Sequence, residues 1–100
     1  MKAIARCEYV SPIKEFTSKK GDSMKKVEVK FSFADSEDNY MNTILVTFFN
    51  DMAEKISQRL RAGECYEIHL SLQTYRTASG AEFNDLRVRE ILLEGKNVMQ

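Results

Sequence analysis

The sequence predicts an all-β domain with one short helix, and three observations carry this prediction. Residues 27–33 and 66–72 alternate apolar and polar side chains with a period of two, which is the pattern of half-buried strands. Residues 42–49 are dense in β-branched and aromatic side chains, which suit a pleated surface. Residues 51–61 repeat apolar side chains at helical spacing with charged residues between them, which predicts one amphipathic helix.

Chain length, net charge and cysteine spacing limit the possible domain organisation and ligands further. The 100 residues are enough for one domain, which we place at residues 1–100. Lys and Arg number 15, as do Asp and Glu, so the net charge is zero and no global field attracts nucleic acid. Any such site must come from local segregation of cations. Cys7 and Cys65 form no Cys-x-x-Cys pair, which predicts two buried free thiols, with a disulfide as the alternative.

The first part of the chain predicts two strands and two loops. Residues 2–16 carry apolar side chains on both parities, as expected for a strand that curls to pair with two neighbours, with a bulge or edge at residues 11–12. Residues 17–26 form a lysine-rich loop around a Gly-Asp turn. After the strand at 27–33, residues 35–40 form an acidic loop, which would repel phosphate.

The second part predicts strand, helix, strand, turn and strand. Asn50 and Asp51 supply short polar side chains for a helix start, and Gly63 closes the helix. We expect the helix over residues 51–61, with Ile56 on its buried face. The strand at 66–72 is followed by a turn at 78–81 and by a strand in which Leu86 and Val88 resume the alternation. Residues 94–100 are expected to fray.

This order matches the second half of a five-stranded OB-fold Greek-key barrel, in which one short helix lies between strands three and four. In residues 46–56, 60–64, 70–75 and 79–83 a hydrophobic strand ends in an aromatic, the helix carries an Ala-Glu pattern, and a Gly-turn hairpin ends in another aromatic. In these segments the chain resembles bacterial and phage single-stranded-DNA-binding proteins. Leu70 stands where that family usually has Gly, so the resemblance is to a divergent member.

The resemblance implies a nucleic-acid-binding surface, and the residues offer the chemistry for one. Binders of single strands combine cations for the backbone with aromatic platforms for the bases. Phe31, Phe33 and Phe48 share parity with core positions, whereas Phe49 and Tyr75 do not, and Phe49 matches the family's stacking aromatic. The predicted stacking residues are Phe49, Tyr75, Phe83, Phe16 and Tyr40. The predicted phosphate-binding residues are Lys14, Lys19, Lys20, Lys25, Lys26, Lys30, Arg76, Arg87 and Arg89. For Phe16, Tyr40 and Phe83, edge packing against the helix or a partner subunit is an equal alternative.

Catalytic and targeting signals are missing from the sequence. The one histidine, His69, lies on the polar face of a predicted strand without a Cys or His at ligand spacing, so we expect it to face solvent or pair across strands. We therefore predict no enzyme activity, no metal site and no cofactor. No stretch resembles a signal peptide or approaches the ~20 apolar residues of a membrane span, which predicts a cytoplasmic protein without a membrane partner.

The predicted function is sequence-tolerant binding of single-stranded DNA, coating unwound strands in replication, recombination or repair, at the nucleoid or in a phage-infected cell. A binder of long strands gains affinity by linking several sites, which predicts a homodimer or homotetramer. The zero net charge, the acidic loop and the absence of that family's acidic partner-recruiting tail favour another class, an OB-fold protein-interaction or assembly module. RNA binding is a third alternative.

Overall fold

The structure is a computed structural model that describes the backbone of residues 1–34 and 41–100. It is mostly β with one short helix, as predicted. In chain order the elements are β1 (Lys2–Val10), β2 (Lys14–Thr17), β3 (Ser23–Ala34), β4 (Met41–Phe49), α1 (Asn50–Arg59), β5 (Cys65–Arg76), β6 (Glu82–Leu93) and β7 (Lys96–Asn97). The seven strands exceed the expected five because the first predicted strand is divided into β1 and β2, and because β7 follows the last.

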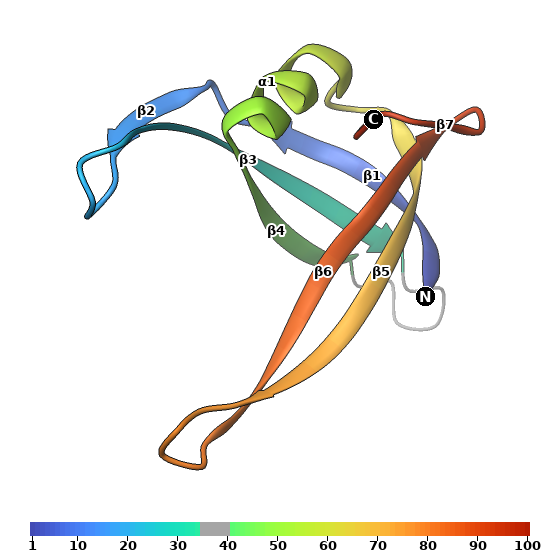
Figure 1. Cartoon of the computed structure of the whole chain (residues 1–100). Helices are drawn as coiled ribbons and strands as arrows, with labels where there is room; N and C mark the ends of the chain where they lie inside the picture. The colour runs from blue at the N-terminus through green and yellow to red at the C-terminus, as the bar shows by residue number, and fades with distance from the viewer. Residues whose placement is uncertain (35–40) are drawn as a thin grey trace.

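The strands form one curled antiparallel sheet (Figure 1). The order is β2-β3-β1-β5-β6-β7, and β4 pairs with the other edge of β3. The long strand β3 therefore pairs with three neighbours. Among the described residues β4 and β6 do not pair, and a cavity of about 330 Å³ lies between them, lined in part by Val46 and Val88. The sheet is thus a half-barrel with an open seam.

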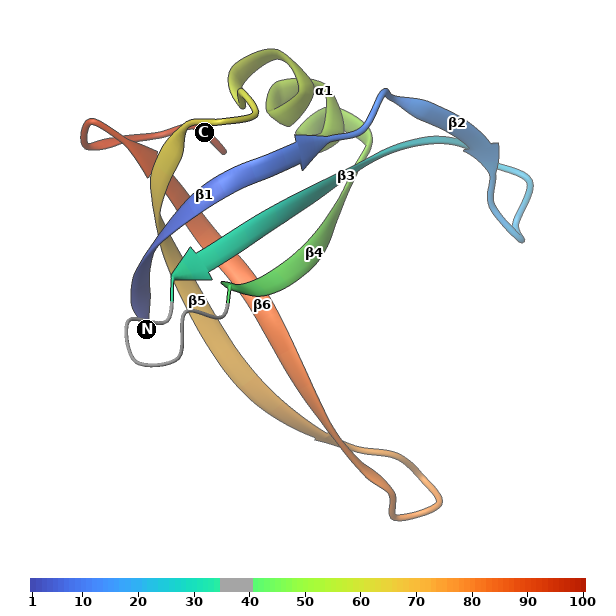
Figure 2. The ribbon, with the colours of Figure 1, turned by 180° about the vertical axis from the view of Figure 1, so that it is seen from behind.

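The core fills the inner face of this sheet. Val27, Val29 and Phe31 of β3 are fully buried, as are Tyr66 and Ile68 of β5. These are inward positions that the period-two pattern predicts, and both patterned strands are confirmed. Leu72 is the exception, because the same pattern predicts it inward and it is 61% exposed. The helix α1 covers one end of the curled sheet and adds its buried apolar face to the core (Figure 2).

The helix begins one residue earlier and ends two residues earlier than predicted. Asn50 takes a left-handed conformation with φ of 53°, which an asparagine tolerates better than most residues. We expected Asn50 to satisfy free amides of the helix, but the helix start has no side-chain cap. Instead the Lys25 amide donates to Asn50 Oδ1 at 3.1 Å, so Asn50 ties the helix start to β3.

The break in the first strand lies where the Ser11-Pro12 pair predicted an irregularity. Ser11 is buried and replaces the missing ladder contacts, because its amide donates to the Glu28 carbonyl at 2.9 Å and its Oγ accepts from the Glu28 amide at 2.8 Å. A separate shift of register falls between Cys7 and Tyr9, where β1 has one residue more than β3. The mixed pattern of residues 2–16 is consistent with a change of face along this strand, but it did not locate this second irregularity.

The C-terminal segment is ordered, contrary to our expectation that residues 94–100 fray. Lys96–Asn97 pair with the end of β6, and the Val98 amide donates to the Ile91 carbonyl at 2.9 Å. The Met99 amide donates to Asn97 Oδ1 at 3.0 Å, and the side chains of Val98 and Met99 pack against the core. This apolar contact offsets the cost of ordering the segment. Within residues 1–34 and 41–100, no helix is long and apolar enough to cross a membrane.

Candidate nucleic-acid interface

Three neighbouring strands place aromatic and basic side chains together on the outer face of the sheet. Lys26 of β3 pairs with Lys14 of β2 on one side and with Phe49 of β4 on the other, so these three residues form a row. Phe16 lies two residues beyond Lys14 and therefore on the same face. We call Lys14, Phe16, Lys26 and Phe49 the aromatic cluster.

The geometry within the aromatic cluster suits contact with a flat ligand. The Phe16 and Phe49 ring centroids are 6.3 Å apart with an interplanar angle of 65°, an edge-to-face arrangement. Lys26 Nζ lies 5.6 Å from the Phe16 ring centroid, within cation–π range. Phe49 remains 48% exposed and Phe16 is half-buried, so their mutual contact leaves ring surface open. This combination of open rings and an ammonium group can hold a base and its phosphate.

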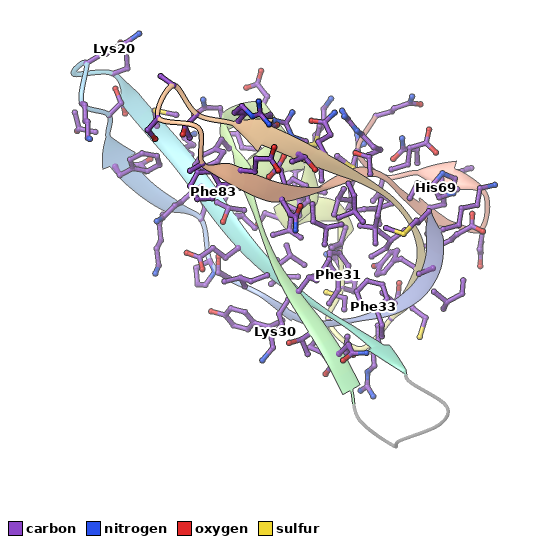
Figure 3. The ribbon with its side chains drawn as sticks, turned by 90° about the horizontal axis from the view of Figure 1, so that it is seen from below. Lys20, Lys30, Phe31, Phe33, His69 and Phe83 are labelled. Atoms are coloured by element: carbon purple, nitrogen blue, oxygen red, sulfur yellow. The ribbon has the colours of Figure 1, made fainter. Side chains whose placement is uncertain are left out.

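The predicted phosphate-binding lysines of β2, β3 and the loop between them differ in whether they already form an ion pair with a carboxylate. Lys25 faces the opposite side, where its Nζ lies 2.7 Å from Glu54 Oε1, and this hydrogen bond with the nearby charge raises the pKa of Lys25. Lys26 has a looser contact of 3.9 Å with Glu28. Lys14, Lys19, Lys20 and Lys30 have no ion pair with any described residue. Lys20 projects from the tip of the β2–β3 hairpin (Figure 3).

The β5–β6 hairpin carries a second group, centred on Tyr75. The Tyr75 hydroxyl donates to Gln73 and lies 3.2 Å from Asp85 Oδ2, while Arg87 Nε donates to that same oxygen at 2.6 Å. Arg87 also donates to the Tyr75 hydroxyl, and its guanidinium carbon lies 5.8 Å from the Tyr75 ring centroid. The Arg87 hydrogen bond lowers the pKa of Asp85, and Asp85 raises the pKa of Arg87. The positive charge of Arg87 is therefore partly neutralised by the Asp85 carboxylate.

The remaining predicted residues of this hairpin are exposed. Phe83 lies directly opposite Tyr75 and is 56% exposed. Arg76 forms an ion pair of 2.7 Å with Glu82, its partner across the strands. Arg89 Nε donates to Ser71 Oγ at 2.9 Å, and Arg89 forms no ion pair with a carboxylate of the described residues. Tyr40, the fifth predicted aromatic, lies outside the described residues.

The two hairpins project to the same side of the molecule, on the left in Figure 1 and on the right in Figure 2. In both views β4 lies between β3 and β6. The aromatic cluster lies at the base of the β2–β3 hairpin, and the Tyr75 group lies on the β5–β6 hairpin. The structure thus brings Phe16, Phe49, Lys14 and Lys26 together, and it holds Tyr75, Phe83 and Arg87 as a separate group.

Sequence reasoning missed a second row on the same outer face. Tyr9 of β1 pairs with Lys30 of β3, and Lys30 pairs with Leu45 of β4. Tyr9 is 51% exposed and Leu45 is 62% exposed, while Lys30 projects on the side of β3 opposite to the buried Phe31 (Figure 3). Strand parity had predicted Lys30 as outward, but it assigned no face to Tyr9, because the first strand carries apolar side chains on both parities.

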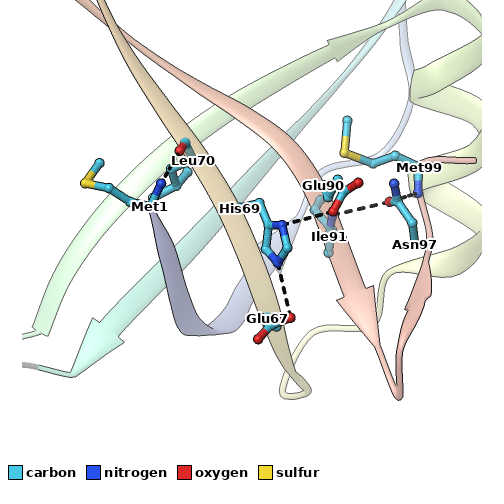
Figure 4. A network of polar contacts seen from close by, with 8 residues as sticks. All are labelled: Met1, Glu67, His69, Leu70, Glu90, Ile91, Asn97 and Met99. Carbon is cyan, nitrogen blue, oxygen red and sulfur yellow. Dashed lines mark hydrogen bonds and ion pairs between the residues drawn. The ribbon is translucent and has the colours of Figure 1, made fainter.

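His69 lies away from both groups, on β5 where the N-terminus meets the sheet (Figure 4). Its Nδ1 is 2.9 Å from Glu90 Oε2 on β6, and its Nε2 is 3.2 Å from Glu67 Oε2. Next to it, the amino group of Met1 donates to the Leu70 carbonyl at 2.8 Å. His69 therefore pairs across strands, one of the two arrangements that its position predicted.

The two cysteines are free thiols, as predicted, but only one is buried. Burial raises the pKa of the Cys7 thiol. Cys65 is exposed because it stands at the start of β5 opposite Arg6, on the outer face of the sheet.

Comparison with known protein families finds none that matches this chain, and comparison with curated proteins finds no matching sequence. The class of protein to which the chain belongs must therefore be inferred from its geometry and residues.

Proposed function

We propose that this protein binds single-stranded DNA without strong sequence preference, using the outer face of β2, β3 and β4. The aromatic cluster is the observation that carries the proposal. Phe16, Phe49 and Lys26 come from three strands, and they place open ring surface within cation–π distance of an ammonium group. Every base has a π-face and every nucleotide a phosphate, so such a surface accepts any sequence.

The fold that we propose is a divergent five-stranded OB-fold Greek-key barrel. In this assignment β1 and β2 together are the first strand, and β3, β4, β5 and β6 are the second to fifth. Three observations support it: β3 pairs with both parts of the first strand, β1 also pairs with β5, and the helix lies between β4 and β5. OB-folds bind oligonucleotides on the face of strands two and three, bordered by two hairpin loops. The aromatic cluster lies on that face.

The cellular role that fits such a surface is the coating of unwound strands during replication, recombination or repair. The outer face of one domain is short compared with a long DNA strand. Several copies held together would therefore bind that strand more tightly than a single copy. We propose a homodimer or homotetramer for this reason. Stacking and phosphate contacts do not distinguish the sugar, so RNA is the alternative ligand.

The test is a fluorescence-anisotropy titration with labelled oligo-dT, the matching duplex and an oligo-rU of equal length, each over a series of salt concentrations. We expect oligo-dT to bind more tightly than the duplex, because paired bases do not offer their faces for stacking. We expect the affinity to fall with rising salt as counterions are released. Equal binding of duplex and single strand, or no binding of either, would contradict the proposal.

A protein-interaction module is the second candidate function, and one feature favours it. A mainly apolar groove of about 440 Å³ lies between the end of β3 and the β5–β6 hairpin, and Phe33, Ile44, Leu70, Leu72 and Leu86 contribute to its lining. Leu72 and Leu86 are both exposed there, so the groove presents contiguous apolar surface to a partner. Failure to bind any nucleic acid, with the fold intact, would favour this candidate.

A further inference from the structure

The β-bulge in β1 determines where the Tyr9 side chain points. Ala3, Ala5, Cys7 and Tyr9 share one parity, and the first three face inward in the structure. Cys7 pairs with Phe31, but Tyr9 pairs with Lys30, so Glu8 is the extra residue and the parity changes after it. Tyr9 therefore reaches the outer face, although an unbroken strand would have turned it into the core. Bulges re-aim side chains in this way at functional sites.

Tyr9 repeats the chemistry of the aromatic cluster four residues further along β3. In the first row Lys26 lies beside Phe49, and in the second row Lys30 lies beside Tyr9. Both aromatics are about half exposed. Lys30 has no ion pair with any residue in the described part of the chain, so its charge is available to a phosphate.

We infer that Tyr9 is a second base-stacking platform and that Lys30 binds the phosphate beside it, so that one strand runs along β3 across both rows. The inference rests on the proposed function and specifies its site. Four residues of β3 span about 13 Å at about 3.3 Å per residue. A stacked strand advances about 3.4 Å per nucleotide, so the two rows are about four nucleotides apart. This spacing falls within the site sizes of about 4–16 nucleotides found for such barrels.

The test compares four variants in the anisotropy titration with a 12-nucleotide oligo-dT. Tyr9→Leu keeps an apolar side chain but removes the flat ring, and we expect it to weaken binding about 5- to 150-fold with no change in salt dependence. Tyr9→Phe keeps the ring and should bind like the parent. Lys30→Ala should lower the slope of log K against log salt by about 0.7. Ile4→Ala is the matched control, because Ile4 is an exposed apolar residue of β1 paired with Glu67, away from both rows.

Cross-linking provides a second measurement that does not depend on how a variant folds. Oligo-dT containing 5-iodouracil, irradiated with the parent protein and mapped by mass spectrometry, should attach to Tyr9 as well as to the aromatic cluster. Parent-like binding by Tyr9→Leu, together with a loss in Phe49→Ala, would overturn the inference and leave the proposed function standing. A parent that binds no oligonucleotide would overturn both. Cross-links at the aromatic cluster but none at Tyr9 would also overturn the inference.

Discussion

Asp85 contacts Tyr75 and Arg87, two of the side chains of the β5–β6 hairpin that were expected to meet nucleic acid. Its carboxylate accepts a hydrogen bond from Arg87, and the same oxygen lies 3.2 Å from the Tyr75 hydroxyl. Under the proposed function, a phosphate that binds Arg87 has to compete with this contact. We expect Asp85→Asn to strengthen oligo-dT binding and to steepen its salt dependence by about 0.7, because Arg87 gains a phosphate contact. Glu94→Gln is the matched control, since it also removes one negative charge, from an exposed position outside this hairpin. Binding no stronger than that of the control would contradict a role for Arg87.

The hydrogen bond from Arg87 also keeps the Asp85 carboxylate ionised to a lower pH. The Arg87 hydrogen bond lowers the pKa of Asp85 below its ordinary value of 3.8. A carboxylate whose pKa is lower in the folded state stabilises the fold above its unfolded pKa, and this contribution is lost as the pH falls through the folded pKa. NMR titration of the Asp85 carboxyl carbon should give a midpoint below pH 3.8, and Arg87→Ala should raise that midpoint. A midpoint at or above 3.8 in the parent would contradict the hydrogen bond.

Residue by residue, the sequence predicted exposure better than it predicted partners. Parity placed Phe49 on the outer face correctly, because Phe49 lies on an unbroken strand. Lys26 was expected in a loop, whereas β3 begins at Ser23 and includes it. Parity assigned no face to Tyr9, because the first strand carries apolar side chains on both parities and a bulge is a matter of pairing between strands. The contact between Lys25 and Glu54 depends on the packing of α1 beside β3. The pattern within one element does not show how two elements pack together.

At the scale of elements, the helix depends on its buried face. Ile56 is completely buried between α1 and the sheet. Ile56→Asp places an unpaired carboxylate there, at a cost of several kcal/mol against a total stability of ~5–15 kcal/mol, so we expect the domain to unfold. Gln58→Asp adds the same charge on the exposed side of α1 and should leave the domain folded. Circular dichroism during thermal unfolding distinguishes the two. A cooperative transition in Ile56→Asp near that of the parent would show that α1 does not seal the core.

Long periodic elements were predicted well and short ones were not. Strands β3 and β5 each contain several alternations of apolar and polar residues, and the helix contains two turns of apolar spacing. A pattern repeated this often identifies the type of element reliably. The strand β7 has two residues and no period at all. Its order comes from the Asn97 side chain and from the packing of Val98 and Met99, which are tertiary contacts. Sequence reasoning therefore expected this segment to fray.

At the scale of the whole molecule, the open seam and the exposed apolar side chains favour assembly. Leu45, Leu72 and Leu86 expose apolar surface near β4 and β6, whose facing edges do not pair with each other among the described residues. Unpaired strand edges and exposed apolar surface are features that subunit interfaces cover. We expect sedimentation equilibrium at micromolar concentration to give two or four times the chain mass of 11.6 kDa. An 11.6 kDa species alone would contradict the predicted homo-oligomer.

The central claim is that the aromatic cluster binds single strands through two separable contacts, stacking and charge. The most direct measurement is the salt dependence of oligo-dT affinity for the parent, Phe49→Ala and Lys26→Ala. Phe49→Ala should weaken binding by ~1–3 kcal/mol at every salt concentration and leave the slope unchanged, because it removes no phosphate contact. Lys26→Ala should reduce the slope by about 0.7. If both variants bind oligo-dT with the affinity and slope of the parent, the outer face of β2, β3 and β4 is not the binding surface.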